Sequence, residues 1–474
     1  MARAWQIAIV GTFDVENYGD LLFPIIAEAE LSRRLGAVTM HRFSYHDRTP
    51  PAWPYAVTSL ADLPQCSQQL DGLLVGGGFI LRFDKVVAHG YGPPSPDIHH
   101  PTGYWLTPAL LAIEQGIPVI WNAPGMHCNE VPAWAAPLLR LALANSACIR
   151  VRDALTQETL ARVATDAHIS VLPDTAFGLP RLLDPQQPSA EFARIAAAAG
   201  LGDRYLVIHA IAGLEPFLRL IRQYPQQFSD YQLLLLPIGP VLGDHAAVLG
   251  DELPRAVQLP SWPAPMLLAE LIANAQAVVG HSYHLAITAI AFGVPAFCSA
   301  DLGVGKYTAL AAFESVFPLP ADDEPDPRWI LDRIGRKSPS AAAQQAAGQL
   351  VEYWDEVADV LRAGRSATPP AFPRFWQDLP NWLESAVDRQ ETLADDHAHR
   401  EQALLADLAH AHAQLTASAA ALDETGHRLA LMTAAKDEAE HQLALQRAAE
   451  AARITARLRA LLRGLRKPVE NDER

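Results

Sequence analysis

The sequence predicts two doubly wound α/β domains that face a cleft, followed by a long C-terminal helix or coiled coil. Short apolar runs that end in glycine or a polar residue alternate with helical patterns, which is typical of parallel sheets covered by helices on both faces. A polar stretch with two prolines, residues 182–192, separates these strand–helix series into two sets. Leucines at every seventh position near the C-terminus predict a helical seam.

Composition narrows the function classes. The 474 residues correspond to about three structural units at the usual domain size. A net charge of −16 argues against a nucleic-acid binder, because such proteins neutralise phosphates with clustered Lys and Arg. The cysteines lack C-x-x-C spacing and no His, Asp or Glu cluster has ligand spacing, so we expect no disulfide frame, no metal and no other cofactor. With no signal-peptide pattern and no apolar run of about 18 residues, we expect a cytoplasmic protein.

The first strand–helix unit has a polar turn at a candidate ligand site. An apolar run at 6–11 ends in glycine, and a helix is expected from about residue 20 to 34. Between them lie Asn17, Gly19 and Asp20. Either Asn17 or Asp20 caps the helix, or the loop amides and the helix N-terminus bind an anion or a sugar. The turn lacks the G-x-G-x-x-G pattern, which disfavours a dinucleotide site of that kind.

Three more strand ends in this half carry candidate binding residues. The first is a glycine triplet, Gly76, Gly77 and Gly78. Its backbone either approaches a ligand closely or packs at a crowded crossover. Arg152 follows another strand and either holds a carboxylate or phosphate, or forms a structural salt bridge with Asp153 or Asp174. Asp174 is itself either a loop cap or a site residue.

The second series of strands places histidines at strand ends. His209 lies at the end of a strand at 205–210, and an apolar strand at 277–279 leads to His281, Ser282 and His284. Ligands bind outside the carboxyl ends of strands in open α/β sheets, and imidazole is suited to proton transfer near neutral pH. We therefore expect His281 and His284 to be catalytic and His209 to line the cleft. The alternative is that these two histidines cap the following helix or bond a buried carbonyl.

We expect four segments: an N-terminal domain at 1–182, a second domain at 193–325, a helical and Pro/aromatic connector at 326–380, and a long helix or coiled coil at 381–467. The leucines of the seam are Leu408, Leu415, Leu422 and Leu429. The facing positions are poor, so this helix either dimerises weakly, packs on a partner or stands alone in solvent. Its basic end, 453–467, either contacts anionic lipid or a carrier's phosphates, or flanks the coiled coil.

Taken in order along the chain, these motifs resemble the polysaccharide pyruvyl transferase family over about residues 5–320. The matching elements are the opening strand with Asn17-x-Gly19-Asp20, the strand into Gly76-Gly77-Gly78, Arg152-Asp153 before a helix, the Pro173-Asp174 turn, and Ser282-Tyr283-His284 with the helix that ends in Gly293-Val294-Pro295. The resemblance implies two Rossmann-like domains, similar in architecture to glycosyltransferases of the GT-B kind. It does not extend to the C-terminal tail.

The resemblance implies an enzyme that moves the pyruvyl group of phosphoenolpyruvate onto two hydroxyls of a sugar, forming a ketal and releasing phosphate. It gives His284 the general acid/base role and Arg152 the role of holding the carboxylate or phosphate. Many family members have arginine two residues before the histidine, where this chain has Ser282. The candidates to replace that arginine are Arg82, Lys85 and Lys306.

The acceptor implied by the resemblance is a sugar of a cell-envelope or exopolysaccharide precursor, nucleotide- or lipid-linked, handled in the cytoplasm or at the inner face of the membrane. Two other functions stay open. A glycosyltransferase would need a nucleotide pocket in the second domain, for which Glu215 and Asp244 are the candidates. An inactive scaffold would use the tail to recruit envelope-assembly proteins or a second copy of the chain.

Overall fold

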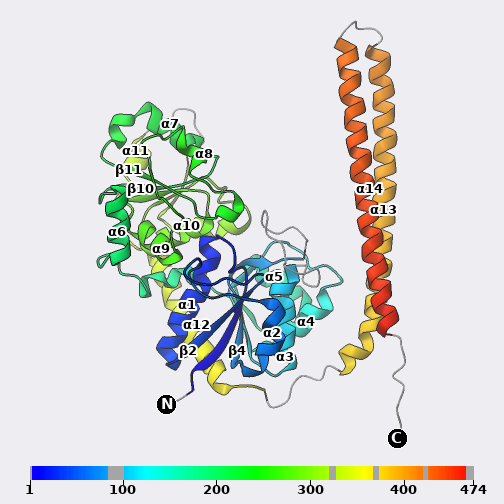
Figure 1. The fold of residues 1–474 in the computed structure, drawn as a ribbon, viewed down its shortest axis with the longest axis horizontal. Coiled ribbons are helices and arrows are strands. Elements are labelled where there is room, and N and C mark those ends of the chain that lie inside the picture. Colours follow the sequence, from blue (N-terminus) through cyan, green and yellow to red (C-terminus); the bar gives the residue numbers. More distant parts are fainter. Residues whose placement is uncertain (1–2, 84–100, 320–326, 367–372, 420–424, 466–474) are drawn as a thin grey trace. The chain divides into compact units, whose positions relative to one another are not determined.

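The computed structural model describes residues 3–83, 101–319, 327–366, 373–419 and 425–465. The chain forms two compact units, residues 1–370 and 371–474. The first unit contains two large sheets with helices on their faces, and the second is a pair of long helices (Figure 1).

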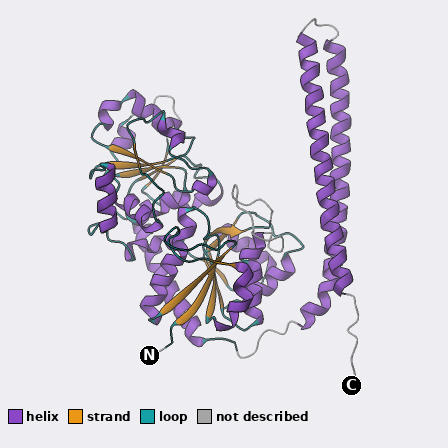
Figure 2. Ribbon diagram, viewed as in Figure 1, coloured by secondary structure: helices purple, strands orange, loops and turns teal. Residues whose placement is uncertain are grey.

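The first unit has a seven-stranded sheet, here the N-terminal domain, and a six-stranded sheet, here the C-terminal domain (Figure 2). In spatial order the first sheet is β3 (Thr58–Ser59), β2 (Val38–Ser44), β1 (Trp5–Val10), β4 (Gly72–Val75), β6 (Val119–Asn122), β8 (Cys148–Val151) and β9 (Ile169–Val171). The second is β12 (Val257–Gln258), β11 (Gln232–Leu236), β10 (Tyr205–His209), β13 (Ala277–Gly280), β14 (Ala296–Cys298) and β15 (Val316–Pro318). A separate pair joins β5 (Gly78–Leu81) and β7 (Pro124–Met126).

Both large sheets are parallel and doubly wound, so the predicted fold class is confirmed. In the first, β1 lies between β2 and β4, and in the second, β10 lies between β11 and β13. The strand order reverses at these central strands, which is where open α/β sheets bind ligands. The central strands are buried on both faces, as in Ile7–Val10, because helices cover each side.

Helices fill the crossovers of both sheets. In the N-terminal domain they are α1 (Tyr18–Leu35), α2 (Leu63–Cys66), α3 (Leu106–Glu114), α4 (Ala136–Ala144) and α5 (Ala154–Val163). After them come α6 (Ala190–Ala199), α7 (Glu215–Gln223), α8 (Ala247–Gly250), α9 (Pro265–Asn274), α10 (Tyr283–Ala291), α11 (Arg328–Leu331) and α12 (Ala341–Ala363). The two helices that carry the predicted site residues, α1 and α10, both begin where a central strand has just ended.

Helix α12 returns to the N-terminal domain and runs beside α1 (Figure 1). Tyr353 donates a hydrogen bond to Asn122 Oδ1 at 2.9 Å, and Glu356 pairs with Arg150. Leu361 lies against Gly72, where a β-carbon would overlap it. The segment predicted as a connector, 326–380, thus contains a helix that completes the first sheet's core, and residues 373–380 already belong to the next helix.

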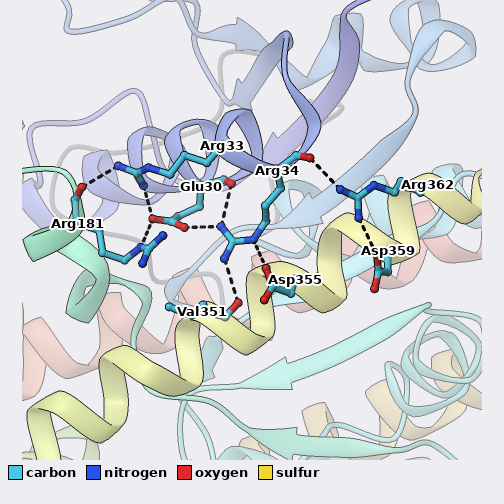
Figure 3. Close-up of polar contacts among 8 residues, drawn as sticks. All are labelled: Glu30, Arg33, Arg34, Arg181, Val351, Asp355, Asp359 and Arg362. Atoms are coloured by element: carbon cyan, nitrogen blue, oxygen red, sulfur yellow. Dashed lines mark hydrogen bonds and ion pairs between the residues drawn. The ribbon is translucent and has the colours of Figure 1, made fainter.

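A network of ion pairs around the buried carboxylate of Glu30 links α1 to α12 and to Arg181, at the start of the interdomain linker (Figure 3). Glu30 on α1, with only 1% of its side chain exposed, accepts hydrogen bonds from Arg33, Arg34 and Arg181. Arg34 also pairs with Asp355 of α12 at 2.6 Å. Burial alone would raise the pKa of Glu30, but Arg181 and Arg34 outweigh it and lower the pKa.

We expect Glu30→Gln to lower the free energy of unfolding by about 3 kcal/mol, because removing one partner of a buried ion pair leaves the other charges uncompensated. Urea unfolding at pH 7 measures the effect.

The stabilisation by Glu30 should also depend on pH, because folding lowers the pKa of this carboxyl group. Its contribution is present above the unfolded-state pKa near 4.5 and is lost as pH falls through the folded-state pKa. Asp359→Asn is the matched control: Asp359 pairs with Arg362 in the same region but is 76% exposed, so its loss should cost at most about 0.5 kcal/mol. Equal unfolding midpoints for the two variants would contradict the role of Glu30.

The C-terminal unit is a helical hairpin of α13 (Pro373–Ala419) and α14 (Thr425–Leu465), not the single long helix that the sequence predicted. The helices pack side by side, and Glu391 in the first half of α13 pairs with Arg459 near the end of α14, so they are antiparallel (Figure 1). Because α14 packs on α13, both helices of this contact come from one chain. Large apolar side chains still face outward, among them Leu404 and Met432, which are 68% and 70% exposed.

The basic end at 453–467 lies mostly on α14 within this hairpin. Within it, Arg459 forms an ion pair with Glu391. Residues 466 and 467 of that segment, and Leu422 of the predicted seam, fall outside the described residues. Among the described helices, none combines the length and apolar character needed to cross a bilayer.

Candidate active site in the interdomain cleft

A cleft of about 350 Å³ lies between the two domains, at the carboxyl ends of their central strands. Residues that follow β1, β10, β11 and β13 form its walls, together with the 3-10 helix η7 (Gly305–Ala312). Its polar lining consists of Thr12, Asn17, Asp20, Arg82, His127, Arg152, His209, Asp244, His281, Ser282, Tyr283, His284, Lys306 and Tyr307. Across the described residues, no group of three or more His, Cys, Asp or Glu side chains is arranged to hold a metal ion.

His284 stands on the first turn of α10 and is held by both domains. Ser282 caps this helix by accepting a hydrogen bond from the Leu285 N–H at 3.4 Å, so neither histidine is the cap. His284 Nε2 lies 3.3 Å from Asp174 Oδ2, and its side chain is 12% exposed. The ring also lies against Gly19, where a β-carbon would overlap it. Asp174 thus faces Nε2, and Nδ1 is the ring atom that lies nearest to the position of a Gly19 β-carbon.

Asp174 joins His284 to Arg152. Its Oδ1 caps the 3-10 helix η4 (Thr175–Arg181) by accepting from the Ala176 N–H at 3.0 Å, while Oδ2 lies 3.5 Å from Arg152 Nη1. The loop-cap role considered for Asp174 therefore occurs, and the same side chain also contacts His284 and Arg152. Burial would raise the pKa of Asp174, but His284 and then Arg152 outweigh it and lower the pKa. This carboxyl group is therefore ionised near neutral pH.

Arg152 is enclosed yet incompletely bonded. Its guanidinium lies over the rings of Phe79 and Tyr283, with the central carbon 4.9 and 4.8 Å from their centres, and only 2% of its side chain is exposed. Its Nη2 has no hydrogen-bond partner among the described residues. Asp153, the other partner considered for it, instead caps α5 through the Thr156 N–H at 2.7 Å. Nη2 of Arg152 thus keeps N–H groups that can donate hydrogen bonds to an anionic oxygen.

Asp20 and Lys306 add a second pair of charges to the cleft. Asp20 accepts a hydrogen bond from Thr12 Oγ1 at 2.8 Å. Burial raises the pKa of Asp20, although His284, Lys306 and Arg152 oppose the rise. Burial also lowers the pKa of Lys306 to about 8, with Arg152 adding to the shift and Asp20 opposing it. Lys306 therefore changes charge close to neutral pH.

His209 and Asp244 form a pair beneath His281 in the C-terminal domain. His209 Nε2 lies 2.5 Å from Asp244 Oδ2, which also accepts from the Ile238 and Gly239 N–H groups. His209 Nδ1 accepts from the His281 backbone N–H at 3.3 Å. Both ring nitrogens of His209 are used within the protein, so the structure places it to orient its neighbours and not to bond a substrate directly.

Of the predicted turn residues, Asn17 lines the cleft and the glycine triplet does not. Asn17 lines the cleft, and although it occupies the N-cap position of α1 its side chain makes no capping bond. The glycine triplet packs instead: β-carbons at Gly76 and Gly77 would overlap the Val10 carbonyl oxygen and the Phe23 ring. Gly78 has φ +86°, and a β-carbon there would overlap Asp20 Oδ1. Glycine at this position therefore leaves room for that carboxylate. The described lining of the cleft does not include the triplet.

Several lining residues carry no local signal in the sequence. Thr12, Phe79, His127 and Tyr307 face the cleft because of tertiary structure alone. Of the three proposed replacements for the missing arginine, Arg82 and Lys306 line the cleft, and Lys85 lies outside the described residues. Lys306 is the second residue of η7, and no local pattern in the sequence marks it as a site residue.

Two doubly wound domains with histidine, arginine and lysine side chains at their facing strand ends define a two-domain α/β enzyme. Within that class, the model of the family "Polysaccharide pyruvyl transferase" matches residues 17–300, more than half of the chain. The chain belongs to this family of enzymes. The matched range contains Asn17, Arg152, Asp174 and His284 and excludes Lys306 and the helical hairpin.

Solved structures are similar to this chain at the level of fold. The UDP-GlcNAc 2-epimerase from Methanocaldococcus jannaschii shares 11% identity with a TM-score of 0.47, over 74% of this chain and 100% of that one. The E. coli ADP-heptose lps heptosyltransferase II shares 14% identity with a TM-score of 0.36, over 76% and 99%. No curated protein matches the chain.

Proposed function

We propose that this protein transfers the pyruvyl group of phosphoenolpyruvate to two hydroxyls of one sugar in a cell-envelope or exopolysaccharide precursor, nucleotide- or lipid-linked. A ketal forms and phosphate is released. The supporting observation is the Arg152–Asp174–His284 cluster: a buried guanidinium with an unbonded Nη2 stands beside an Asp–His pair in the cleft. Such a cluster combines an anion receptor with a proton-transfer group.

The reaction needs two additions to one carbon. The first hydroxyl oxygen bonds to C2 of phosphoenolpyruvate while C3 gains a proton and becomes a methyl group. The C2–O bond to phosphate then breaks, and the second hydroxyl oxygen bonds to C2 as its proton leaves. The products are the ketal and inorganic phosphate, and no electrons are exchanged.

We assign roles from the contacts described above. Arg152 binds the carboxylate or phosphate through Nη2, and Lys306 provides the second positive charge. His284, which lies 3.3 Å from Asp174, delivers the proton to C3. The Phe79 and Tyr283 rings that flank Arg152 exclude water and strengthen its attraction for an anion.

The two candidate residues of the glycosyltransferase alternative differ in their positions. Asp244 lines the cleft, and its Oδ2 is used by His209 and two backbone N–H groups. Glu215 opens α7 and does not line the described cleft. The described cleft therefore contains one of the two acids, and one oxygen of that acid is already bonded within the protein.

Thermal unfolding of the full chain tests the donor. Phosphoenolpyruvate at about 100 times its dissociation constant should raise the free energy of unfolding by about 2.7 kcal/mol. UDP and UDP-glucose at the same concentrations should give no shift. A shift with the nucleotides alone would favour the glycosyltransferase, and no shift with phosphoenolpyruvate would contradict the proposed donor.

Lys306 should make donor binding pH-dependent. Its pKa of about 8 means that the charge that attracts the phosphate is lost as pH rises through 8. We expect the affinity for phosphoenolpyruvate to fall by up to about tenfold per pH unit above that value. In Lys306→Arg the charge persists, so affinity should stay level to pH 9.5, and in Lys306→Met it should be low throughout. Titration calorimetry from pH 7 to 9.5 measures this, and parallel profiles for wild type and Lys306→Arg would exclude the role.

A further inference from the structure

The two histidines that flank Ser282 stand in different electrostatic surroundings. His284 Nε2 lies 3.3 Å from Asp174 Oδ2, and the pKa of this buried carboxyl group is lowered. Burial lowers the pKa of His281, three residues earlier, and His209 and Lys306 lower it further, against a weaker opposing effect of Asp244. A carboxylate beside one histidine and a lysine beside the other suit the two rings to act as an acid and a base.

The contacts of His281 fix its ring and leave one nitrogen exposed to the cleft. Its Nδ1 lies 3.4 Å from Ser299 Oγ, and its ring packs edge-on against Tyr307 with centroids 5.3 Å apart. Ser299 directly follows β14, and Tyr307 belongs to η7. No hydrogen-bond partner of Nε2 occurs among the described residues, which leaves this nitrogen for a ligand in the cleft.

Hydrogen bonds also hold the backbone of His281 in place. Its N–H donates to His209 Nδ1, which must therefore be unprotonated, so the His209 proton is on Nε2 and faces Asp244. Asp244 in turn holds the Ile238 and Gly239 N–H groups at 3.0 and 2.6 Å. This chain of bonds ties the loops after β10, β11 and β13 together. The charged and titratable groups that face His281 are thus His209, Asp244, Lys306 and Tyr307.

We infer that His281 is the base that takes the proton from the attacking sugar hydroxyl, while His284 is the acid, and that the acceptor sugar binds in the C-terminal-domain half of the cleft. This inference rests on the proposed function and adds to it the second proton-transfer group and the acceptor's location. His209 and Asp244 are positioning residues for that base.

The protons balance over one turnover. In the first addition the hydroxyl proton passes to His281 Nε2 as its oxygen bonds to C2, and His284 gives its proton to C3. When the C2–O bond to phosphate breaks, His281 returns its proton to the leaving phosphate. The second hydroxyl then gives its proton to neutral His284. Both histidines regain their starting states.

His281→Gln tests the inference by phosphate release from phosphoenolpyruvate, with p-nitrophenyl glycosides of galactose, glucose, mannose and N-acetylmannosamine as acceptors. We expect kcat to fall about 10²- to 10⁴-fold. Donor affinity should change less than twofold, because Arg152 and Lys306 bind the donor. His168→Gln, an exposed histidine outside the cleft, is the matched control and should match wild type.

The outcomes separate the two proposals. Phosphate release by wild type and equally by His281→Gln would overturn the role of His281 and leave the pyruvyl transferase intact. No release by wild type with any of the four glycosides would overturn the proposed function, and the role of His281 with it. A parallel loss of donor affinity in His281→Gln would place His281 in the donor site and also overturn the inference.

A pH profile distinguishes a base from a structural residue. The wild-type rate should fall on the acid side as His281 becomes protonated, below the ordinary histidine value near pH 6.5. His281→Gln should lose this limb. Asp244→Asn, which places an amide N–H or a weaker acceptor opposite His209, should keep the limb, shift it and lower kcat while donor affinity is unchanged. NMR titration of the histidine side chains, assigned with His281→Gln, should show His281 titrating below the ordinary histidine value near 6.5, and titration at or above that value would contradict the assignment.

Discussion

His284→Gln is expected to lower the rate of phosphate release about 10²- to 10⁴-fold, because glutamine fills the same space without carrying a transferable proton. Single-turnover measurement with saturating phosphoenolpyruvate isolates this step. The unfolding midpoint in urea should move little, since the side chain is at the cleft surface and Ser282 keeps the helix cap. A variant that turns over within threefold of wild type would remove His284 from the chemistry.

Gly19→Ala tests the same residue without changing any functional group. A β-carbon at position 19 would overlap the His284 ring, so the ring must move by about an ångström or more. A displacement of that size costs on the order of 10²-fold in rate, and overpacking costs about 1–3 kcal/mol of stability. Gly178→Ala is the matched control, because its β-carbon would meet only ordinary contacts at 3.8 Å from Ile26 and Leu350. Loss of activity in both variants would point to a general effect of alanine and not to His284.

Arg152→Met should weaken phosphoenolpyruvate binding by about 2–5 kcal/mol, roughly 30- to 5,000-fold, because it removes a buried cation from both the ligand and Asp174. Arg152→Lys keeps the charge but loses the planar fork that the rings of Phe79 and Tyr283 orient, so we expect an intermediate loss of about tenfold. Titration calorimetry gives both values.

The control for Arg152 is Arg162→Met on the same strand–helix unit. Arg162 is exposed in the last turn of α5, so donor affinity should stay at the wild-type value. Unchanged binding in Arg152→Met would show that the donor's negative charges lie elsewhere in the cleft.

The sheets could be predicted because each strand is specified locally. Runs such as Ile7–Val10 and Ala277–Val279 are short, apolar and followed by a glycine and a helix, which is enough to place a buried parallel strand. The same logic placed Arg152, His281 and His284 near one cleft, since the carboxyl ends of parallel strands share an edge.

Contacts across long sequence separations could not be predicted. Nothing near Gly19 indicates that it packs against a histidine 265 positions away, and the packing role of the glycine triplet depends on Phe23 and Asp20 on another element. Asp244 appeared as a candidate for a nucleotide, yet its oxygen is used by His209 and by its own loop. A local pattern shows that a polar group is present and not whether the fold has already bonded it.

The tail shows a limit of periodicity. The seven-residue leucine spacing predicts a helical seam, but spacing alone does not say which helix faces it. The structure supplies the second helix from the same chain, with Glu391 opposite Arg459.

Helix α12 affects the order in which this protein can fold. Domains commonly fold as they leave the ribosome, the N-terminal one first. Here the first sheet lacks Tyr353, Trp354 and Leu361 until residue 363 has been made, after the whole second domain. The N-terminal domain therefore completes its core last, and a gene fragment that stops at residue 325 encodes a first domain with an open apolar surface.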